Sequence, residues 1–186
     1  IISALIVLVL AVSLTACGGS GDGEGITNKP SLFKPTLTKY VNENALNEKV
    51  AEINLRNKGK AIGFVCDVRD YNQVCAARDK AVEAFGRIDI MANFAGGTAV
   101  RMCKVDREKH PEFPDVPIDV YDWGIDVNLK GPFYFAHAVL GQMREQRSGL
   151  ILNIGSITGE EGCGSNVGYA TSKSAAMNGL TKSIAK

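Results

Sequence analysis

The sequence predicts an α/β fold in which helices cover both faces of a parallel sheet. Apolar, strand-like segments alternate with amphipathic helical segments along most of the chain, and this order is typical of parallel sheets. The 186 residues suffice for one domain of ordinary size. The composition is globular, with 45% hydrophobic residues, 22% charged residues and a net charge of +1. It gives no indication of nucleic-acid binding, because the basic residues are scattered among acidic ones.

The N-terminal segment 1–25 differs from the rest of the chain. Residues 1–16 are almost wholly apolar, which is short for a membrane span but suits a secretory signal. The letters LTAC at 14–17 resemble the lipobox of bacterial lipoproteins, and the glycine-rich stretch behind them would form a flexible tether. We therefore interpret 1–25 as an apolar leader, anchored to a membrane through Cys17 if the leader is authentic, and 26–44 as an unassigned linker.

An alternative interpretation makes a phosphate loop of the same glycines. Gly19, Gly23 and Gly25 give the pattern G-x-x-x-G-x-G, and a strand before such a loop could cradle a pyrophosphate. Two acidic residues inside the loop would repel the phosphates, and two prolines follow where a helix should run. We favour the leader, and we expect the chain to be an incomplete piece of a longer protein.

The alternating pattern begins at residue 45. Apolar residues at helical spacing predict helices, and short apolar runs predict buried strands. The expected helices are 45–59, 71–86, 119–147 with a break near Gly131–Pro132, and 168–186. The expected strands, which should lie side by side, are 61–66, 88–93 and 150–155.

Five short motifs occur in order along this pattern. They are CDV at 66–68, NFAGG at 93–97, DVNLKGPF at 126–133, NIGSITG at 153–159 and YATSK at 169–173. The last motif alone is weak, because tyrosine and lysine meet at this spacing by chance in many chains. Together, the five resemble the short-chain dehydrogenase/reductase family from about Ala45 to Lys186. The resemblance implies that 45–186 is a partial domain with an incomplete Rossmann-like fold, a doubly wound parallel sheet.

Tyr169 and Lys173 lie four residues apart, which places them on one side of a helix with their Cβ atoms about 5–6 Å apart. A free phenol has a pKa near 10, and bringing it to about 7 requires about 4 kcal/mol. An exposed helix pair supplies only about 0.2–0.5 kcal/mol. We therefore expect Lys173 to act from a desolvated site, where its charge favours a phenolate more strongly.

The resemblance implies a catalytic set of Asn128, Ser156, Tyr169 and Lys173. Tyr169 would exchange a proton with the substrate oxygen while a hydride moves to or from carbon, and Ser156 would donate a hydrogen bond to that oxygen. Lys173 would favour the phenolate and hold the nicotinamide ribose, and Asn128 would help to keep a water for proton relay. The implied reaction interconverts a small-molecule alcohol and a carbonyl with NAD or NADP.

The resemblance also implies the cofactor-binding residues. Asp67 would bind the adenine amino group, and Val68 would contact the adenine through its backbone. Asn93, Ala95 and Gly96 would line the cofactor. Asp67 and Asn93 each follow a predicted strand, as does the catalytic serine, so these residues should meet at one edge of the sheet.

The sequence departs from the family pattern in three places. The first strand and its T-G-x-x-x-G-x-G phosphate loop are not recognisable, and the family's last two strands have no counterpart before Lys186. Phe94 stands where the family has a second asparagine, and we expect it to pack against the sheet. Two functions therefore remain open: an active NAD(P)-dependent oxidoreductase, or an inactive remnant joined to a lipoprotein-like leader. The enzyme portion would be cytoplasmic, whereas a functional leader would place the chain on a membrane.

The remaining expectations concern metals and assembly. No metal site is expected, because the five cysteines include no C-x-x-C pair and the two histidines have no metal-like spacing to them. In the family, the two long helices that match 128–147 and 168–186 form a four-helix interface, so we expect a homo-oligomer for the intact parent. Apolar residues spread around the first of these helices: Phe133, Phe135, Val139, Leu140 and Met143.

Overall fold

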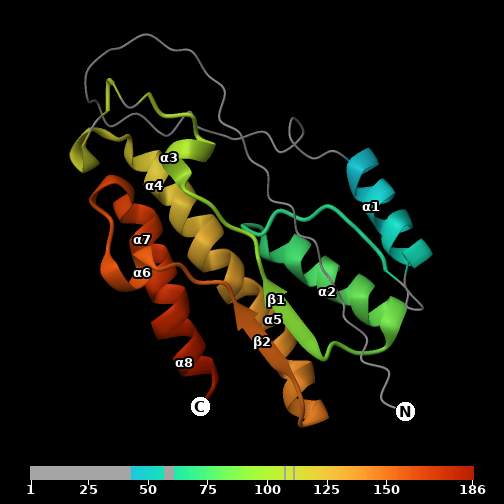
Figure 1. Ribbon diagram of the computed structural model, residues 1–186. Coiled ribbons are helices and arrows are strands. Elements are labelled where there is room, and N and C mark those ends of the chain that lie inside the picture. Colours follow the sequence, from blue (N-terminus) through green and yellow to red (C-terminus); the bar gives the residue numbers. More distant parts are fainter. Residues whose placement is uncertain (1–42, 57–60, 107, 111) are drawn as a thin grey trace.

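The structure, a computed structural model, describes residues 43–56, 61–106, 108–110 and 112–186 (Figure 1). The expectations for the apolar leader, the lipobox-like cysteine and the alternative phosphate loop lie outside these residues. Across the described ranges, none of the helices is both long enough and apolar enough to span a membrane.

Helices make up most of the described chain. The α-helices are α1 (Glu43–Arg56), α2 (Tyr71–Phe85), α3 (Ala99–Met102), α4 (Ile118–Ile125), α5 (Gly131–Gln146), α6 (Thr158–Glu161), α7 (Val167–Ser174) and α8 (Thr181–Ile184). Two π-helical turns, η3 (Asp126–Lys130) and η5 (Ala175–Leu180), link α4 to α5 and α7 to α8. Single 3-10 turns occur at Phe113–Asp115 (η2) and Gly164–Asn166 (η4).

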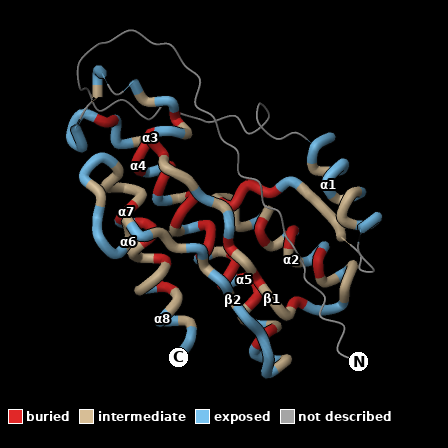
Figure 2. The backbone as a smooth tube through the Cα atoms, in the orientation of Figure 1, coloured by how far each residue is buried: buried red, intermediate tan, exposed pale blue. Residues whose placement is uncertain are grey.

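Strands β1 (Ile90–Asn93) and β2 (Leu150–Asn153) pair in parallel, with Ile90 opposite Leu150 and Asn93 opposite Asn153. Helix α5 packs against β1, and α2 packs against α5 (Figure 1). The core lies between these elements and extends to α3 and α4, and Figure 2 shows buried residues along β1, α2, α4 and α5. Both strands and their parallel pairing agree with the sequence-based expectation. The parallel pairing brings the carboxyl ends of β1 and β2 to the same edge of the sheet.

The expected strand at 61–66 is wrong. The segment is irregular, although Cys66 at its end is buried and Gly63 lies against Leu46 and Val50 of α1. A strand exists only where a neighbour supplies ladder hydrogen bonds. Within the described part of the chain, the sheet consists of β1 and β2, and neither pairs with this segment. The segment packs through Gly63 and Cys66, and Ala61 at its start exchanges two hydrogen bonds with the side chain of Asn54 in α1.

Helix α2 has the boundaries that its sequence predicts. Asp70 caps its N-terminus by accepting hydrogen bonds from the backbone N–H groups of Asn72 (2.9 Å) and Gln73 (3.3 Å). Gly86 ends the helix in the left-handed conformation, with a φ of 82°, which glycine adopts at little cost. The cap matters for the site because it fixes the turn that begins at Asp67, whose carbonyl oxygen accepts from the N–H of Asp70 at 3.0 Å.

The expected break near Gly131–Pro132 is also wrong, because the helix continues from α4 into α5 through the π-turn η3. Proline lacks an N–H, and its ring crowds the carbonyl four residues earlier in an α-helix. The π-turn directly before Pro132 widens the helix there, and the N–H of Gly131 bonds to the carbonyl oxygen of Asp126, five residues back. This turn carries Asn128.

Candidate active site

Tyr169 and Lys173 both belong to α7. The Lys173 ammonium lies 5.8 Å from the centroid of the Tyr169 ring and donates a hydrogen bond of 2.7 Å to the carbonyl oxygen of Ile154. Ile154 directly follows β2. The bond therefore joins α7 to the carboxyl end of the strand, the edge at which parallel sheets bind their ligands.

The Lys173 side chain is buried, with only 4% of the residue exposed. Burial away from water disfavours the ammonium form and lowers the pKa of Lys173 below its ordinary value. An ammonium carries three N–H donors, and Ile154 is the only acceptor for them in the described part of the chain. The remaining donors are available to a hydroxyl group or an anion.

Asn128 joins the loop after β1 to the helix that carries it. Its side-chain amide exchanges two hydrogen bonds of 2.9 Å with the backbone of Gly97 and donates a third, of 2.8 Å, to the carbonyl oxygen of Gly124. A Cβ atom at Gly96 would lie 2.6 Å from Oδ1 of Asn128 and 3.3 Å from Nζ of Lys173. The Gly96 backbone, the asparagine amide and the lysine ammonium therefore converge on one place.

Ser156 lies in the turn between β2 and α6. Its Oγ is 2.9 Å from Oγ1 of Thr158, and its backbone N–H donates to Sδ of Met177 at 3.2 Å. Met177 belongs to η5, the continuation of α7, so its sulfur ties the serine turn to the helix that carries the tyrosine. Nothing in the sequence singles out Met177, because a methionine in a helix normally indicates packing.

Asn93 ends β1 and is buried. Its amide donates a 2.7 Å hydrogen bond to Oδ1 of Asn153 in β2, and Asn153 donates in turn to Oγ1 of Thr181 at 3.0 Å. Ala95 is half-buried. Phe94 between them is 64% exposed, so the expectation that it packs against the sheet is wrong. Successive side chains of an extended segment point to opposite sides. The side chain of Asn93 points to the buried side, so that of Phe94 points to the exposed side.

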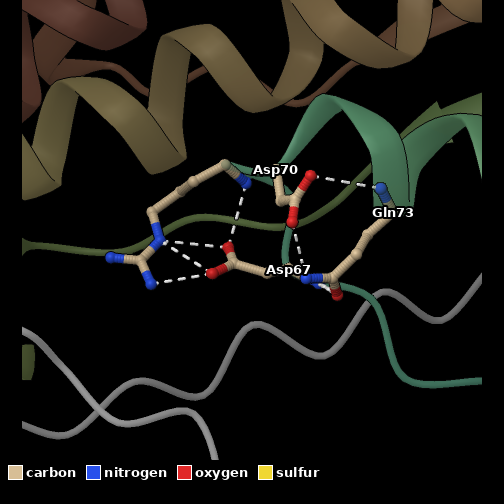
Figure 3. A network of polar contacts seen from close by, with 4 residues as sticks. Asp67, Asp70 and Gln73 are labelled. Atoms are coloured by element: carbon tan, nitrogen blue, oxygen red, sulfur yellow. Dashed lines mark hydrogen bonds and ion pairs between the residues drawn. The ribbon is translucent and has the colours of Figure 1, made fainter.

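Asp67 and Val68 lie before α2, and Asp67 belongs to a separate polar network (Figure 3). Val68 is wholly buried, and its side chain would be 3.0 Å from a Cβ atom at Gly131, the first residue of α5. Asp67 is also buried, and its carboxylate forms a bidentate ion pair with Arg69. The backbone N–H of Asp67 donates to Oε1 of Gln73 at 3.0 Å. The motif CDV at 66–68 does not predict this ion pair, although Arg69 directly follows the motif in the sequence.

Comparison with known proteins relates this arrangement to a family. The family described as short chain dehydrogenase matches residues 34–186. The chain is 37% identical over 128 residues to the 3-oxoacyl-[acyl-carrier-protein] reductase FabG of Thermotoga maritima, covering 69% of this chain and 48% of the reductase. It is 32% identical over 184 residues to an uncharacterized oxidoreductase of Staphylococcus aureus (strain USA300), covering 97% of this chain and 74% of that protein.

Two solved structures share the fold. The structure of NAD+-bound xylitol dehydrogenase superimposes with a TM-score of 0.66 at 30% sequence identity. The match covers 77% of this chain and 51% of the xylitol dehydrogenase chain. Actinorhodin polyketide ketoreductase with NADPH matches the same shares with a TM-score of 0.66 at 27% identity. The chain thus spans about half the length of these two proteins and of the Thermotoga reductase. The incomplete Rossmann-like α/β fold predicted from the sequence is confirmed, and the chain belongs to the short-chain dehydrogenase family.

Proposed function

We propose that the chain carries the acid–base centre of an oxidoreductase that uses NAD or NADP to interconvert an alcohol and a carbonyl. One observation carries the proposal: Lys173 holds a desolvated ammonium beside the ring of Tyr169, at the ligand-binding edge of the sheet. The similarity to an NAD+-bound dehydrogenase and to a ketoreductase with NADPH supports the choice of cofactor.

The residues around Lys173 fit a nicotinamide dinucleotide. The lysine has donors that find no acceptor in the described residues, and the hydroxyl groups of a ribose are suitable acceptors. Gly96 leaves its backbone open to close approach, because a side chain there would collide with Asn128. When bound, the cofactor supplies or accepts the hydride. Asn93, Ala95 and Gly96 would line it, and Val68 would contact it through its backbone.

The protein residues would handle the proton and the substrate oxygen. Tyr169 gives a proton to that oxygen during carbonyl reduction and takes it back during alcohol oxidation. The Lys173 ammonium stabilises the phenolate that remains, and the phenolate in turn compensates the desolvated ammonium. Ser156 donates a hydrogen bond to the same oxygen, and Met177 holds the serine backbone in place. Asn128 fixes the loop beside Lys173 through Gly97 and would help to keep a water for proton relay.

Carbonyl reduction tests this function. NADH and NADPH oxidation would be followed at a panel of ketones for the wild type, for Tyr169→Phe and for the control Tyr134→Phe on α5. We expect Tyr169→Phe to abolish turnover and Tyr134→Phe to retain it. No turnover by the wild type would favour the alternative, an inactive remnant of the family.

We also propose that the intact parent is a homo-oligomer that associates through α5. Phe133 is 51% exposed on this helix, and His137 one turn later is exposed as well. An exposed phenylalanine on a helix face suits burial against a second copy. Sedimentation of the parent and of its Phe133→Asp variant would test this, since the variant should lose the association.

A further inference from the structure

We propose that Tyr121 of α4 is a positioning residue for Tyr169, because its ring forms the seat on which the first turn of α7 rests. The inference rests on the proposed function, in which the Tyr169 phenol exchanges a proton with the substrate oxygen. It adds to that function a residue on another helix that determines where the phenol lies.

The first turn of α7 lacks the side-chain cap that commonly supports the beginning of a helix. The first four N–H groups of a helix have no acceptor within it, and the N-cap side chain often accepts from one of them. Asn166 is the N-cap of α7, but within the described residues its side chain makes no such hydrogen bond. Its amide donates to Oγ of Ser165 at 3.3 Å. Tyr169 is the third residue of α7, so its position depends on what packs against this turn.

The ring of Tyr121 lies directly against Gly168, the residue before Tyr169. Helices α4 and α7 pack against each other (Figure 1). A Cβ atom at Gly168 would lie 2.5 Å from Cδ1 of the Tyr121 ring and 3.3 Å from Cε1, and the shorter distance is less than two carbon atoms allow. Position 168 therefore accepts only glycine while the ring is in place, and the ring contacts the backbone of the turn itself.

Tyr121 is held in place by the turn η2. The residue is buried, and its hydroxyl group donates a hydrogen bond of 3.2 Å to the carbonyl oxygen of Phe113. The centroids of the Phe113 and Tyr121 rings are 5.0 Å apart. The turn is closed on itself, because the N–H of Glu112 donates to Oδ2 of Asp115 at 3.1 Å. A continuous series of contacts therefore leads from η2 through Tyr121 to the first turn of α7.

Lys173 has an anchor of its own at the other end of α7. Its ammonium is bonded to the carbonyl oxygen of Ile154, which directly follows β2. Loss of the Tyr121 ring would therefore let Tyr169 shift while the lysine stays in place. The ammonium would stabilise the phenolate less, because their attraction falls with distance. A displacement of about 1 Å at a reacting group can lower a rate by a factor of about 100.

Removal of the ring tests the inference. Tyr121→Leu removes the ring, whereas Tyr121→Phe removes only the hydroxyl group. For Tyr121→Leu we expect kcat of alcohol oxidation to fall by roughly tenfold or more, the KM for the dinucleotide to change less, and the pH profile of kcat to move to higher pH. Hydrogen exchange followed by mass spectrometry needs no cofactor, and it should show faster exchange in the segment 163–172 of this variant. Tyr121→Phe should remain close to the wild type in each measurement.

An exchange of side-chain size tests the contact itself. Gly168→Ala should lower kcat, because the new Cβ atom would collide with the Tyr121 ring. Adding Tyr121→Leu to Gly168→Ala makes room for this atom, so the double variant should recover part of the loss. Gly179→Ala is the control in the continuation of the same helix, because nothing lies within 4 Å of that position, and it should leave kcat unchanged.

Phe135→Leu separates positioning from stability, because it also removes a buried aromatic ring from the core. It should lower the free energy of unfolding in urea and leave the pH profile and the exchange of 163–172 as in the wild type. If Tyr121→Leu behaves in the same way while Tyr169→Phe still abolishes turnover, the inference is wrong and the proposed function stands. If the wild type shows no turnover, the proposed function fails and the inference fails with it.

Discussion

Asn128 and Gly97 exchange two hydrogen bonds of 2.9 Å, so a side chain of the π-turn pairs with the loop after β1 as a strand neighbour would. Asn128 is wholly buried, and Gly97 is half-buried. The same amide also holds Gly124. The loop that faces Lys173 is therefore positioned from the helix behind it.

Replacing Asn128 by alanine should destabilise the chain by roughly 2–5 kcal/mol, because the half-buried backbone groups of Gly97 and the buried carbonyl of Gly124 would lose their partner. Urea unfolding would measure the loss. Asn72→Ala is the matched control: Asn72 is exposed on α2, and only its backbone N–H contributes to the cap, so little change is expected. Equal stability of the two variants would contradict the role of Asn128 as a clamp.

Gly96→Ala should disturb the site by steric overlap. The new Cβ atom would lie 2.6 Å from Oδ1 of Asn128, closer than a carbon and an oxygen can approach, so either the clamp or the loop must move. We expect a loss of stability in urea and of dinucleotide affinity. Gly141→Ala is the control, because nothing lies within 4 Å of that position in α5, and alanine favours a helix over glycine by about 0.5–1 kcal/mol. The two substitutions should therefore have opposite effects on stability.

Local signals predicted the elements whose stability is local. The sequence predicts a helix over 71–86, and the structure has α2 there, with Asp70 and Gly86 as its caps. The segment 61–66 is apolar enough for a strand, but a strand depends on a neighbour elsewhere in the chain, which a short window of sequence does not contain. Pro132 suggested a break because proline normally ends a helix, and the π-turn before it removes the conflict.

The candidate site shows the same division. The spacing of Tyr169 and Lys173 predicts a pair on one helix, which the structure contains. The partners of that pair come from other elements, since Ile154 and Gly96 reach Lys173 from the ends of two strands. The ion pair of Asp67 with Arg69 depends on how the turn before α2 directs the arginine. A sequence motif identifies such residues, but it does not predict which residues they contact.

Thiol reactivity should separate two cysteines of the described chain. Burial is the main cause that raises the pKa of Cys66 to about 12, and the neighbouring charges of Asp67 and Asp70 add to it. A hydrogen bond from Ser165 is the main cause that lowers the pKa of Cys163, which lies in the turn before α7. Because the thiolate is the reactive form, iodoacetamide at pH 8 should label Cys163 first and Cys66 only after unfolding. Peptide mass spectrometry would measure both rates, and early labelling of Cys66 would contradict its burial.

The buried ammonium of Lys173 should make the folded state more stable as the pH rises in the alkaline range. Burial lowers the pKa of Lys173 in the folded chain, so over this range the unfolded chain holds more protons. Stability increases with pH wherever the unfolded state binds more protons. Below the pKa of Lys173 in the folded chain, burial of the charge lowers the free energy of unfolding by its full amount. This loss disappears as the pH approaches the ordinary lysine pKa of 10.5.

Lys173→Met would reveal this cost, because it removes the charge and keeps an unbranched side chain. We expect the variant to be more stable than the wild type at pH 7 in urea unfolding, and the difference to shrink toward pH 10.5. Lys182→Met is the control, since Lys182 is exposed on α8, and only a small change in stability is expected. A Lys173→Met variant that is less stable than the wild type by the same amount at every pH would show that the hydrogen bond to Ile154 outweighs the desolvation of the ammonium. In that case the hydrogen bond to Ile154 would already offset the desolvation of the Lys173 ammonium. The ammonium would then stabilise a phenolate at Tyr169 less strongly.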